Sequence, residues 1–121
     1  MPREMPTFEK SPPDLVERFD AVLARHAAAD VTRRPMFGYR CAWIGGNMAT
    51  GLFAGQWWVR VSEPDREALL GLPGARPFEV MPGKAMARYV TLPADVVADD
   101  DELDPWIERA LSSTRSLPPK R

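Results

Sequence analysis

The chain has 121 residues, with 16 Lys and Arg against 17 Asp and Glu, which gives a formal net charge of -1. This length suits one domain with a core of its own, and a hydrophobic fraction of 45% with a charged fraction of 27% excludes bulk disorder. The nearly balanced charge argues against a broadly basic surface for nucleic acid.

Residues 1–10 are interpreted as a flexible arm ahead of the first helix. Ser11-Pro12-Pro13-Asp14 predicts the start of that helix, because Ser11 can cap it and proline is tolerated in a first turn. The apolar residues that follow form one stripe at helical spacing: Leu15, Phe19, Val22 and Leu23. His26, the only histidine, falls in the last turn and is interpreted as a surface group.

Three strands joined by two tight turns are predicted between residues 36 and 61, after a polar connector over residues 30–35. The turns fall at Gly45-Gly46-Asn47 and Ala54-Gly55. Because side chains alternate along a strand, one face is predicted to be aliphatic, with Met36, Ala42, Ile44, Met48, Leu52, Trp57, Val59 and Val61. The other face is aromatic with a cationic edge: Phe37, Tyr39, Cys41, Trp43, Phe53, Trp58 and Arg60.

The second half of the chain predicts a helix, a hairpin and a last helix. Ser62-Glu63-Pro64-Asp65 is a start signal for a helix that stops at Gly71. Residues 78–81 and 85–92 form the predicted hairpin, which Pro93 ends. The last helix is predicted to start between Asp100 and Asp104 with Pro105 in its first turn.

The predicted order is therefore α-β-β-β-α-β-β-α. Short links force neighbouring strands to run antiparallel, so the fold class is α+β, with an antiparallel sheet of about five strands packed with helices. One domain is expected over residues 11–115, and residues 116–121 are interpreted as a frayed basic tail.

Few residues suggest chemistry. Cys41 is the only cysteine, and no Cys/His cluster or convergent pair of acids suggests a metal, a cofactor or a catalytic site. Arg40 is next to Cys41 in sequence but should point to the opposite face, so a reactive thiolate is disfavoured. The acidic run Asp99-Asp100-Asp101-Glu102 lacks the spacing of a calcium loop and suits a helix start. An enzyme using Cys41 is the weakest hypothesis.

The aromatic face is the candidate interaction face, with Phe37, Tyr39, Trp43, Phe53, Trp58 and Arg60 as its residues. Three interpretations stay open. The face packs under the last helix, it contacts a second copy or another protein, or it contacts nucleic acid through Arg60, Arg88 and its aromatic rings. The first 14 residues do not form a signal peptide, and no stretch approaches the about 18 apolar residues of a membrane span. A cytoplasmic protein without membrane contact is expected.

Several segments also resemble the N-terminal domain of the TfoX/Sxy family over about residues 32–111. They are Met36-Phe37-Gly38, Gly46-Asn47-Met48, Leu52-Phe53-Ala54-Gly55 running into Trp57-Trp58-Val59-Arg60-Val61, Pro77-Phe78, Gly83-Lys84-Ala85-Met86, and Leu103 and Trp106 followed by Arg109-Ala110-Leu111. Tyr39 stands where this family often has a second glycine after Met-Phe-Gly.

The resemblance implies an α+β domain of antiparallel sheet and helices, without established catalytic residues. Full-length members are bacterial regulators of natural competence, in which this domain precedes a C-terminal domain. We expect a stand-alone domain of this type that acts through protein contacts, as a homodimer or with a protein partner. A regulator that contacts nucleic acid is the alternative.

Overall fold

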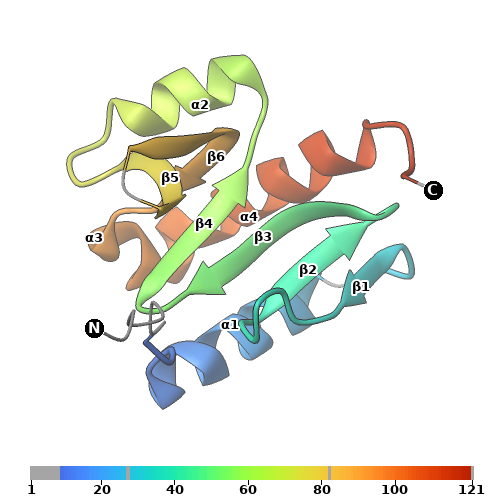
Figure 1. The fold of residues 1–121 in the computed structure, drawn as a ribbon, viewed down its shortest axis with the longest axis horizontal. Helices are drawn as coiled ribbons and strands as arrows, with labels where there is room; N and C mark the ends of the chain where they lie inside the picture. Colours follow the sequence, from blue (N-terminus) through green and yellow to red (C-terminus); the bar gives the residue numbers. More distant parts are fainter. Residues whose placement is uncertain (1–8, 27, 82, 121) are drawn as a thin grey trace, which may run out of the picture.

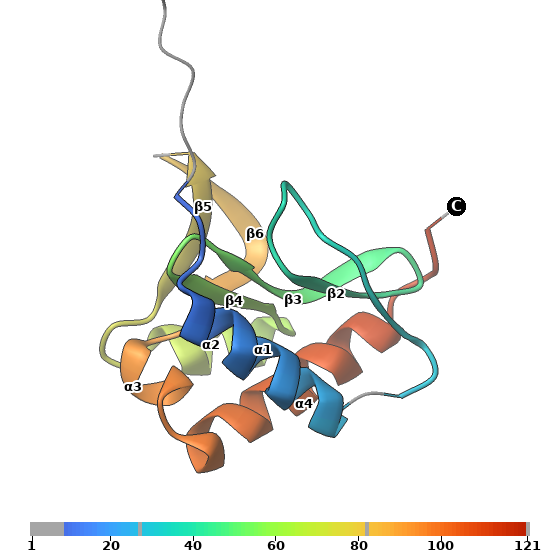
Figure 2. The ribbon, with the colours of Figure 1, turned by 90° about the horizontal axis from the view of Figure 1, so that it is seen from below.

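The computed structural model describes residues 9–26, 28–81 and 83–120. They form one antiparallel sheet in the order β1-β2-β3-β4-β6-β5. Helices α1 and α4 cross one face of the sheet, and the β5–β6 hairpin rises on the other side (Figures 1 and 2). In chain order the elements are α1 (Pro13–His26), β1 (Val31–Arg33), β2 (Cys41–Ile44), β3 (Asn47–Phe53), β4 (Gln56–Arg60), α2 (Glu63–Leu70), β5 (Arg76–Met81), β6 (Lys84–Thr91), α3 (Ala94–Val97) and α4 (Asp100–Arg115).

The predicted α+β class is confirmed, with six strands in place of about five. The sequence prediction misses β1, which was assigned to a connector, and the four-residue helix α3. The start of α2 is confirmed, because Ser62 is its cap residue and accepts a hydrogen bond from the backbone N–H of Asp65. Helix α1 begins at Pro13, within two residues of the predicted cap.

The core on the helix side follows the predicted patterns. Phe19, Val22 and Leu23 of α1 are fully buried, as the apolar stripe requires. The sheet contributes most of the predicted aliphatic face: Ala42, Ile44, Leu52, Trp57, Val59 and Val61. Helix α4 adds Leu103, Trp106, Ile107, Ala110 and Leu111. Burying each large side chain contributes about 1.5–3 kcal/mol, so this layer is the main source of stability.

A second buried cluster lies on the opposite face of the sheet: Tyr39, Cys41, Phe53, Trp58 and Phe78. Phe78 comes from β5. Its ring stacks on Trp58 with centroids 5.4 Å apart and meets Phe53 edge-on at 5.7 Å. The cover of the aromatic face is therefore β5 and not the last helix, which corrects the first of the three interpretations above.

The first predicted strand is in fact a hairpin. Val31, Thr32 and Arg33 pair with Ile44, Trp43 and Ala42, and the same register continues to a bridge between Met36 and Tyr39. Phe37 and Gly38 form the turn, with φ of 54° and 83°, as a two-residue hairpin loop requires. Met36 and Tyr39 are cross-strand partners and share a face, so Met36 joins the aromatic cluster and not the predicted aliphatic face.

A β-bulge corrects the predicted position of Met48 as well. Ala42 pairs with Thr50, but the next residue, Trp43, pairs with Met48, so Ala49 is an extra residue in β3. The extra residue reverses the alternation. Ala49 packs in the helix-side core and Met48 packs against the aromatic cluster.

Two further predictions near the C-terminus need correction. Helix α4 starts at Asp100, within the predicted range, but Pro105 is the sixth helical residue and so lies beyond the first turn. Pro105 is exposed, so water can reach the carbonyl group that its missing N–H leaves without a partner. The tail is not frayed over its described part. The backbone N–H of Lys120 donates to the carbonyl oxygen of Gly45 at 2.7 Å, and Asn47 donates to that of Pro118 at 3.1 Å.

Gly51 is the point where the ring of Trp58 crosses β3. A Cβ atom at Gly51 would lie 2.6 Å from Cζ2 of Trp58 and 2.9 Å from the carbonyl oxygen of Arg40. We predict that Gly51→Ala lowers the free energy of unfolding by about 1–3 kcal/mol in urea denaturation. Gly55→Ala is the control, since a Cβ atom there meets nothing within 4 Å, and it should change stability by less than about 1 kcal/mol. Equal effects of the two variants would show that Trp58 does not depend on this close approach.

Candidate functional site

The six residues of the candidate interaction face separate into two groups in the structure. Tyr39, Phe53 and Trp58 are buried, and Trp58 is 0% exposed. Since their own chain covers them, these three residues cannot provide an open contact surface, and this part of the prediction is corrected. Trp43 and Arg60 are half-buried, and Phe37 is 67% exposed.

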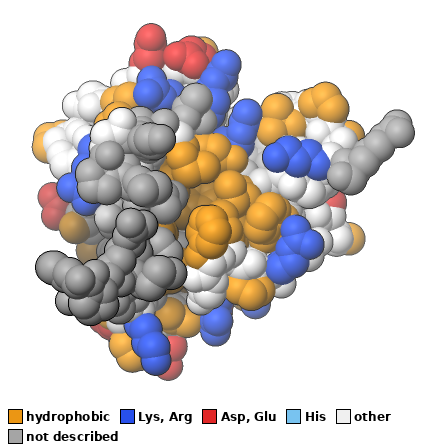
Figure 3. Space-filling model, viewed as in Figure 1, with side chains coloured by type: hydrophobic (Ala, Val, Ile, Leu, Met, Phe, Trp, Pro, Cys, Tyr) orange, Lys and Arg blue, Asp and Glu red, His pale blue; other side chains and the backbone are white. Residues whose placement is uncertain are grey.

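A half-buried apolar surface remains beside the buried cluster. We call it the open-face patch and define it by four residues that pack on that cluster: Met36, Trp43, Met48 and Tyr89. Apolar side chains gather in the middle of this face of the molecule, with Lys and Arg side chains beside them (Figure 3). Sequence analysis missed Met48 and Met36, because a bulge and a turn were needed to bring them to this side.

Trp43 is held in place from two directions. Its indole Nε1–H donates to the carbonyl oxygen of Arg34 at 2.8 Å, and the Arg34 guanidinium lies 4.5 Å from the centroid of the indole ring. A cation over an aromatic face contributes about 0.5–1 kcal/mol at an exposed site. The tryptophan is therefore positioned before any partner arrives.

Arg60 and Arg88 lie in different environments. Arg60 donates to the hydroxyl oxygen of Ser113 at a long 3.5 Å and is the register partner of Tyr89. Arg88 lies 3.3 Å from a carboxylate oxygen of Glu63. Among the residues that the structure describes, neither Arg34 nor Arg60 has an ion pair. These two cations border the open-face patch.

Phe37 is the large hydrophobic side chain most exposed in the described part of the chain. It occupies a turn position with φ of 54°, where glycine, asparagine and aspartate are preferred. A left-handed conformation costs an ordinary residue about 1–2 kcal/mol. A hollow of about 380 Å³ lies beside it, lined in part by Lys10, Val16 and Arg40. An exposed aromatic ring in a strained turn is a candidate contact point.

The described residues offer little support for catalysis. Burial raises the pKa of the Cys41 thiol to about 12, so at neutral pH it stays protonated and is a poor nucleophile. No group of three or more His, Cys, Asp or Glu within residues 9–26, 28–81 and 83–120 could hold a metal ion. A hollow of about 510 Å³ lies by α1 and α3, and its ionisable lining residues are Asp14, Arg18 and Arg76.

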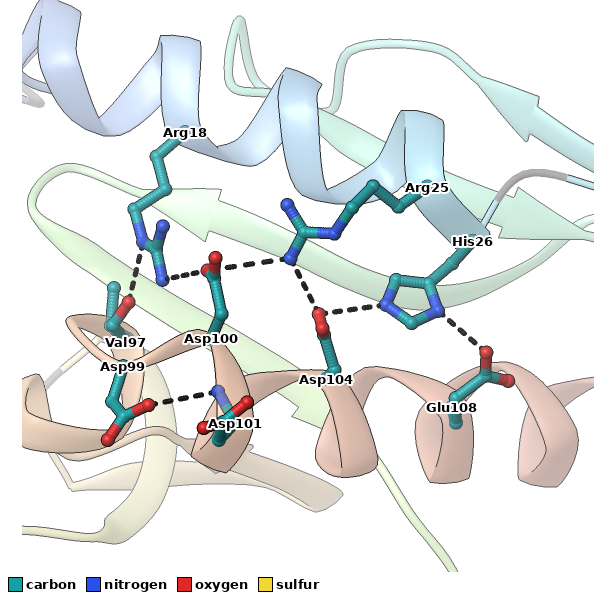
Figure 4. Close-up of polar contacts among 9 residues, drawn as sticks. All are labelled: Arg18, Arg25, His26, Val97, Asp99, Asp100, Asp101, Asp104 and Glu108. Carbon is teal, nitrogen blue, oxygen red and sulfur yellow. Dashed lines mark hydrogen bonds and ion pairs between the residues drawn. The ribbon is translucent and has the colours of Figure 1, made fainter.

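The densest set of polar contacts joins α1 to α4 (Figure 4). His26 is not the surface group that its position suggests, because its side chain is only 9% exposed. Its Nε2 lies 3.0 Å from a carboxylate oxygen of Asp104, and its Nδ1 lies 2.6 Å from one of Glu108. Arg25 also contacts Asp104, at 2.7 Å, and Arg18 contacts Asp100 at 2.8 Å.

The charges in this α1–α4 seam shift the pKa values of its members. Burial opposes protonation of His26, but the hydrogen bonds with Asp104 and Glu108 outweigh it, so the pKa of His26 is raised above 6.5. The hydrogen bond from His26 in turn lowers the pKa of Asp104 below 3.8. The seam is a structural ion-pair network that ties the two helices together.

These features define a small α+β domain with a covered aromatic cluster and an apolar patch beside it. Residues 22–114 match the model of the TfoX N-terminal domain, and the chain belongs to this family. A search of curated proteins found no match. No helix in the described part of the chain is long and apolar enough to cross a membrane.

Replacing Trp58 should damage the fold and not a contact surface. The side chain is fully buried against Phe78 and Tyr89, so Trp58→Ala should lower the free energy of unfolding by about 3–5 kcal/mol in urea denaturation. Trp43→Ala should cost no more than about 2 kcal/mol, because the ring is half exposed. A similar loss in both variants would contradict the division between the buried cluster and the open-face patch.

The His26 contacts predict a dependence of stability on pH. Because the folded-state pKa is raised, the contribution of His26 to stability is fully present below pH 6.5 and is lost as the pH rises through the folded-state value. The free energy of unfolding, measured in urea from about pH 5 to pH 9, should therefore fall across this window more in wild type than in His26→Gln. Identical pH profiles for the two proteins would show that the His26 contacts do not favour the protonated ring.

Proposed function

We propose that this domain is a small regulatory or adaptor module that acts through protein contacts, and that the open-face patch is its contact surface. The observation that carries the proposal is an apolar patch left half open beside a covered aromatic cluster, with Arg34 and Arg60 at its border. Soluble domains seldom expose contiguous apolar surface without a use for it.

The composition of the patch supports a protein partner. Tryptophan, tyrosine, arginine and methionine are the residues enriched at protein interfaces, and the first three dominate binding energy. Methionine is flexible and adapts to the shape of what it contacts. Trp43 is already positioned by Arg34, so binding would immobilise few new rotamers.

We propose that Phe37 is a second point of contact with the same partner. Asparagine or glycine would adopt its left-handed turn conformation with less strain. The Phe37 ring is mostly exposed in the free domain, so it adds little to the burial of apolar surface. A residue that lowers the stability of the fold and does not pack in its core is one that a contact with another molecule would explain.

Nucleic acid is the alternative, and the charges give it less support. Arg88 forms an ion pair with Glu63, so among the described side chains Arg34 and Arg60 are the cations without an ion pair beside the patch. A DNA-binding protein typically makes about 6–10 phosphate contacts, so two arginines would supply only a small part of such a footprint. A contact between two copies through this patch is also disfavoured, because a twofold axis would bring arginines of the same charge together.

The proposal predicts that a photo-reactive benzoylphenylalanine placed at Trp43 or Phe37 captures a protein in cells of the source organism. The same group at Glu67, which is exposed on α2, should not capture it, and adducts should survive nuclease treatment. Phe37→Asn should reduce capture at position 43 while leaving stability unchanged or raising it by up to about 1 kcal/mol.

Three results would contradict this proposal. Adducts that disappear with nuclease would favour the alternative. A dimer in solution that Trp43→Ala dissociates would make a second copy the occupant. Equal capture at positions 43 and 67 would show that the patch has no special role.

A further inference from the structure

We infer that the partner segment bound by the open-face patch is acidic, with large apolar side chains set beside carboxylates. This inference rests on the proposed function, since it specifies the chemistry of the partner at the same surface. It excludes two other occupants, a nucleic acid strand and a second copy of the chain.

The charge pairing of the protein carries the first step. Seven arginines lie 3.8 Å or closer to a carboxylate oxygen of their own chain: Arg18, Arg25, Arg33, Arg40, Arg88, Arg109 and Arg115. Four arginines have no such partner among the described residues: Arg34, Arg60, Arg66 and Arg76. Arg34 and Arg60 both adjoin the apolar patch, so their positive charge is available to a carboxylate that approaches with an apolar group.

The geometry of Arg34 suits this role. The central carbon of its guanidinium lies over the Trp43 ring, 4.5 Å from the ring centroid, in a cation–π contact. A guanidinium carries five N–H donors in a planar fork, so it can contact the ring and still donate to an approaching group. Arg34 can therefore donate two hydrogen bonds to one carboxylate while Trp43 packs against the neighbouring apolar side chain.

Arg60 lies on β4, between the strands that carry Met48 and Tyr89. Its register partner on β6 is Tyr89, whereas Trp43 and Met48 are register partners on β2 and β3. The patch thus spans four adjacent strands, with Arg34 beside Trp43 at one end and Arg60 between the strands of Met48 and Tyr89. A segment lying across the strands would place its apolar residues on Met48 and carboxylates toward both arginines.

The same features argue against the other occupants. A nucleobase could stack on Trp43 only after displacing Arg34 from the ring, and two arginines offer few phosphate contacts. A symmetric contact between two copies would place like charges together with no described carboxylate in the patch to compensate. An acidic protein segment satisfies both arginines without disturbing the Arg34–Trp43 stack.

The test starts from a phage-displayed library of random peptides of about 16 residues. Peptides that bind the immobilised full chain are selected from it. Peptides that also bind the Arg34→Gln/Arg60→Gln variant are removed by counter-selection. The selected peptides should be rich in Asp and Glu together with Trp, Phe or Leu. In fluorescence anisotropy, Arg34→Gln and Arg60→Gln should each weaken binding by up to about fivefold, and raising the salt from about 50 mM to about 500 mM should weaken it as well.

Matched variants separate charge from structure. Arg76→Gln removes an exposed arginine that also lacks a described ion pair but lies on β5, and it should leave binding unchanged. Arg34→Lys should restore part of the affinity, because it keeps the charge but not the planar fork. Methyl signals of Met36 and Met48 should shift on addition of a selected peptide, and Trp58 should remain buried.

The outcomes distinguish this inference from the function on which it rests. Selected peptides that are neutral or basic, yet shift the Met36 and Met48 signals, would overturn the acidic partner and leave the protein-binding function in place. Displacement of a selected peptide by an oligothymidylate of about 20 nucleotides would overturn it in favour of nucleic acid. If no peptide depends on Trp43 or the two arginines, the inference and the proposed function both fail.

Discussion

Two adjacent tryptophans on β4 hold both layers of this protein to the sheet. Because successive strand side chains point to opposite faces, Trp57 enters the helix-side core and Trp58 enters the aromatic cluster. Trp57 packs on Phe19 of α1 at 5.0 Å, and its Nε1–H donates to the hydroxyl of Thr50 at 2.9 Å. Trp58 stacks on Phe78 of β5. Strand β4 therefore couples the helices on one side to the β5–β6 hairpin on the other.

This arrangement also determines where a contact surface can be. Strand β5 lies at one edge of the sheet, and its Phe78 packs on Trp58 of β4 and Phe53 of β3. Near the opposite edge, Trp43 of β2 stays half-buried among the described residues, and its register partner Met48 lies on β3. The contact surface we propose is thus the part of the aromatic face that Phe78 leaves half-buried, from Trp43 on β2 to Tyr89 on β6.

Charge is divided between these two sides in a consistent way. Between α1 and α4, arginines and His26 meet carboxylates across the seam, where they add to the packing of the two helices. Beside the open-face patch, Arg34 and Arg60 have no carboxylate partner among the described residues, and Arg60 donates instead to the hydroxyl oxygen of Ser113 on α4. The ion pairs that join α1 to α4 and the two arginines of the proposed contact surface are therefore different sets of charges.

The sequence by itself determined the features that depend on near neighbours: the apolar stripe of α1, the Ser62 cap of α2, the turns around Gly45 and Ala54, and the α+β class. Alternation correctly separated Trp57 from Trp58. Only the tertiary structure decided the rest. Edge strand β1 depends on pairing with β2 across a turn at Phe37, the bulge at Ala49 redirected Met48, and Phe78, 20 residues beyond Trp58, buried it. A local pattern indicates which way a side chain points, but what covers it depends on residues remote in the chain.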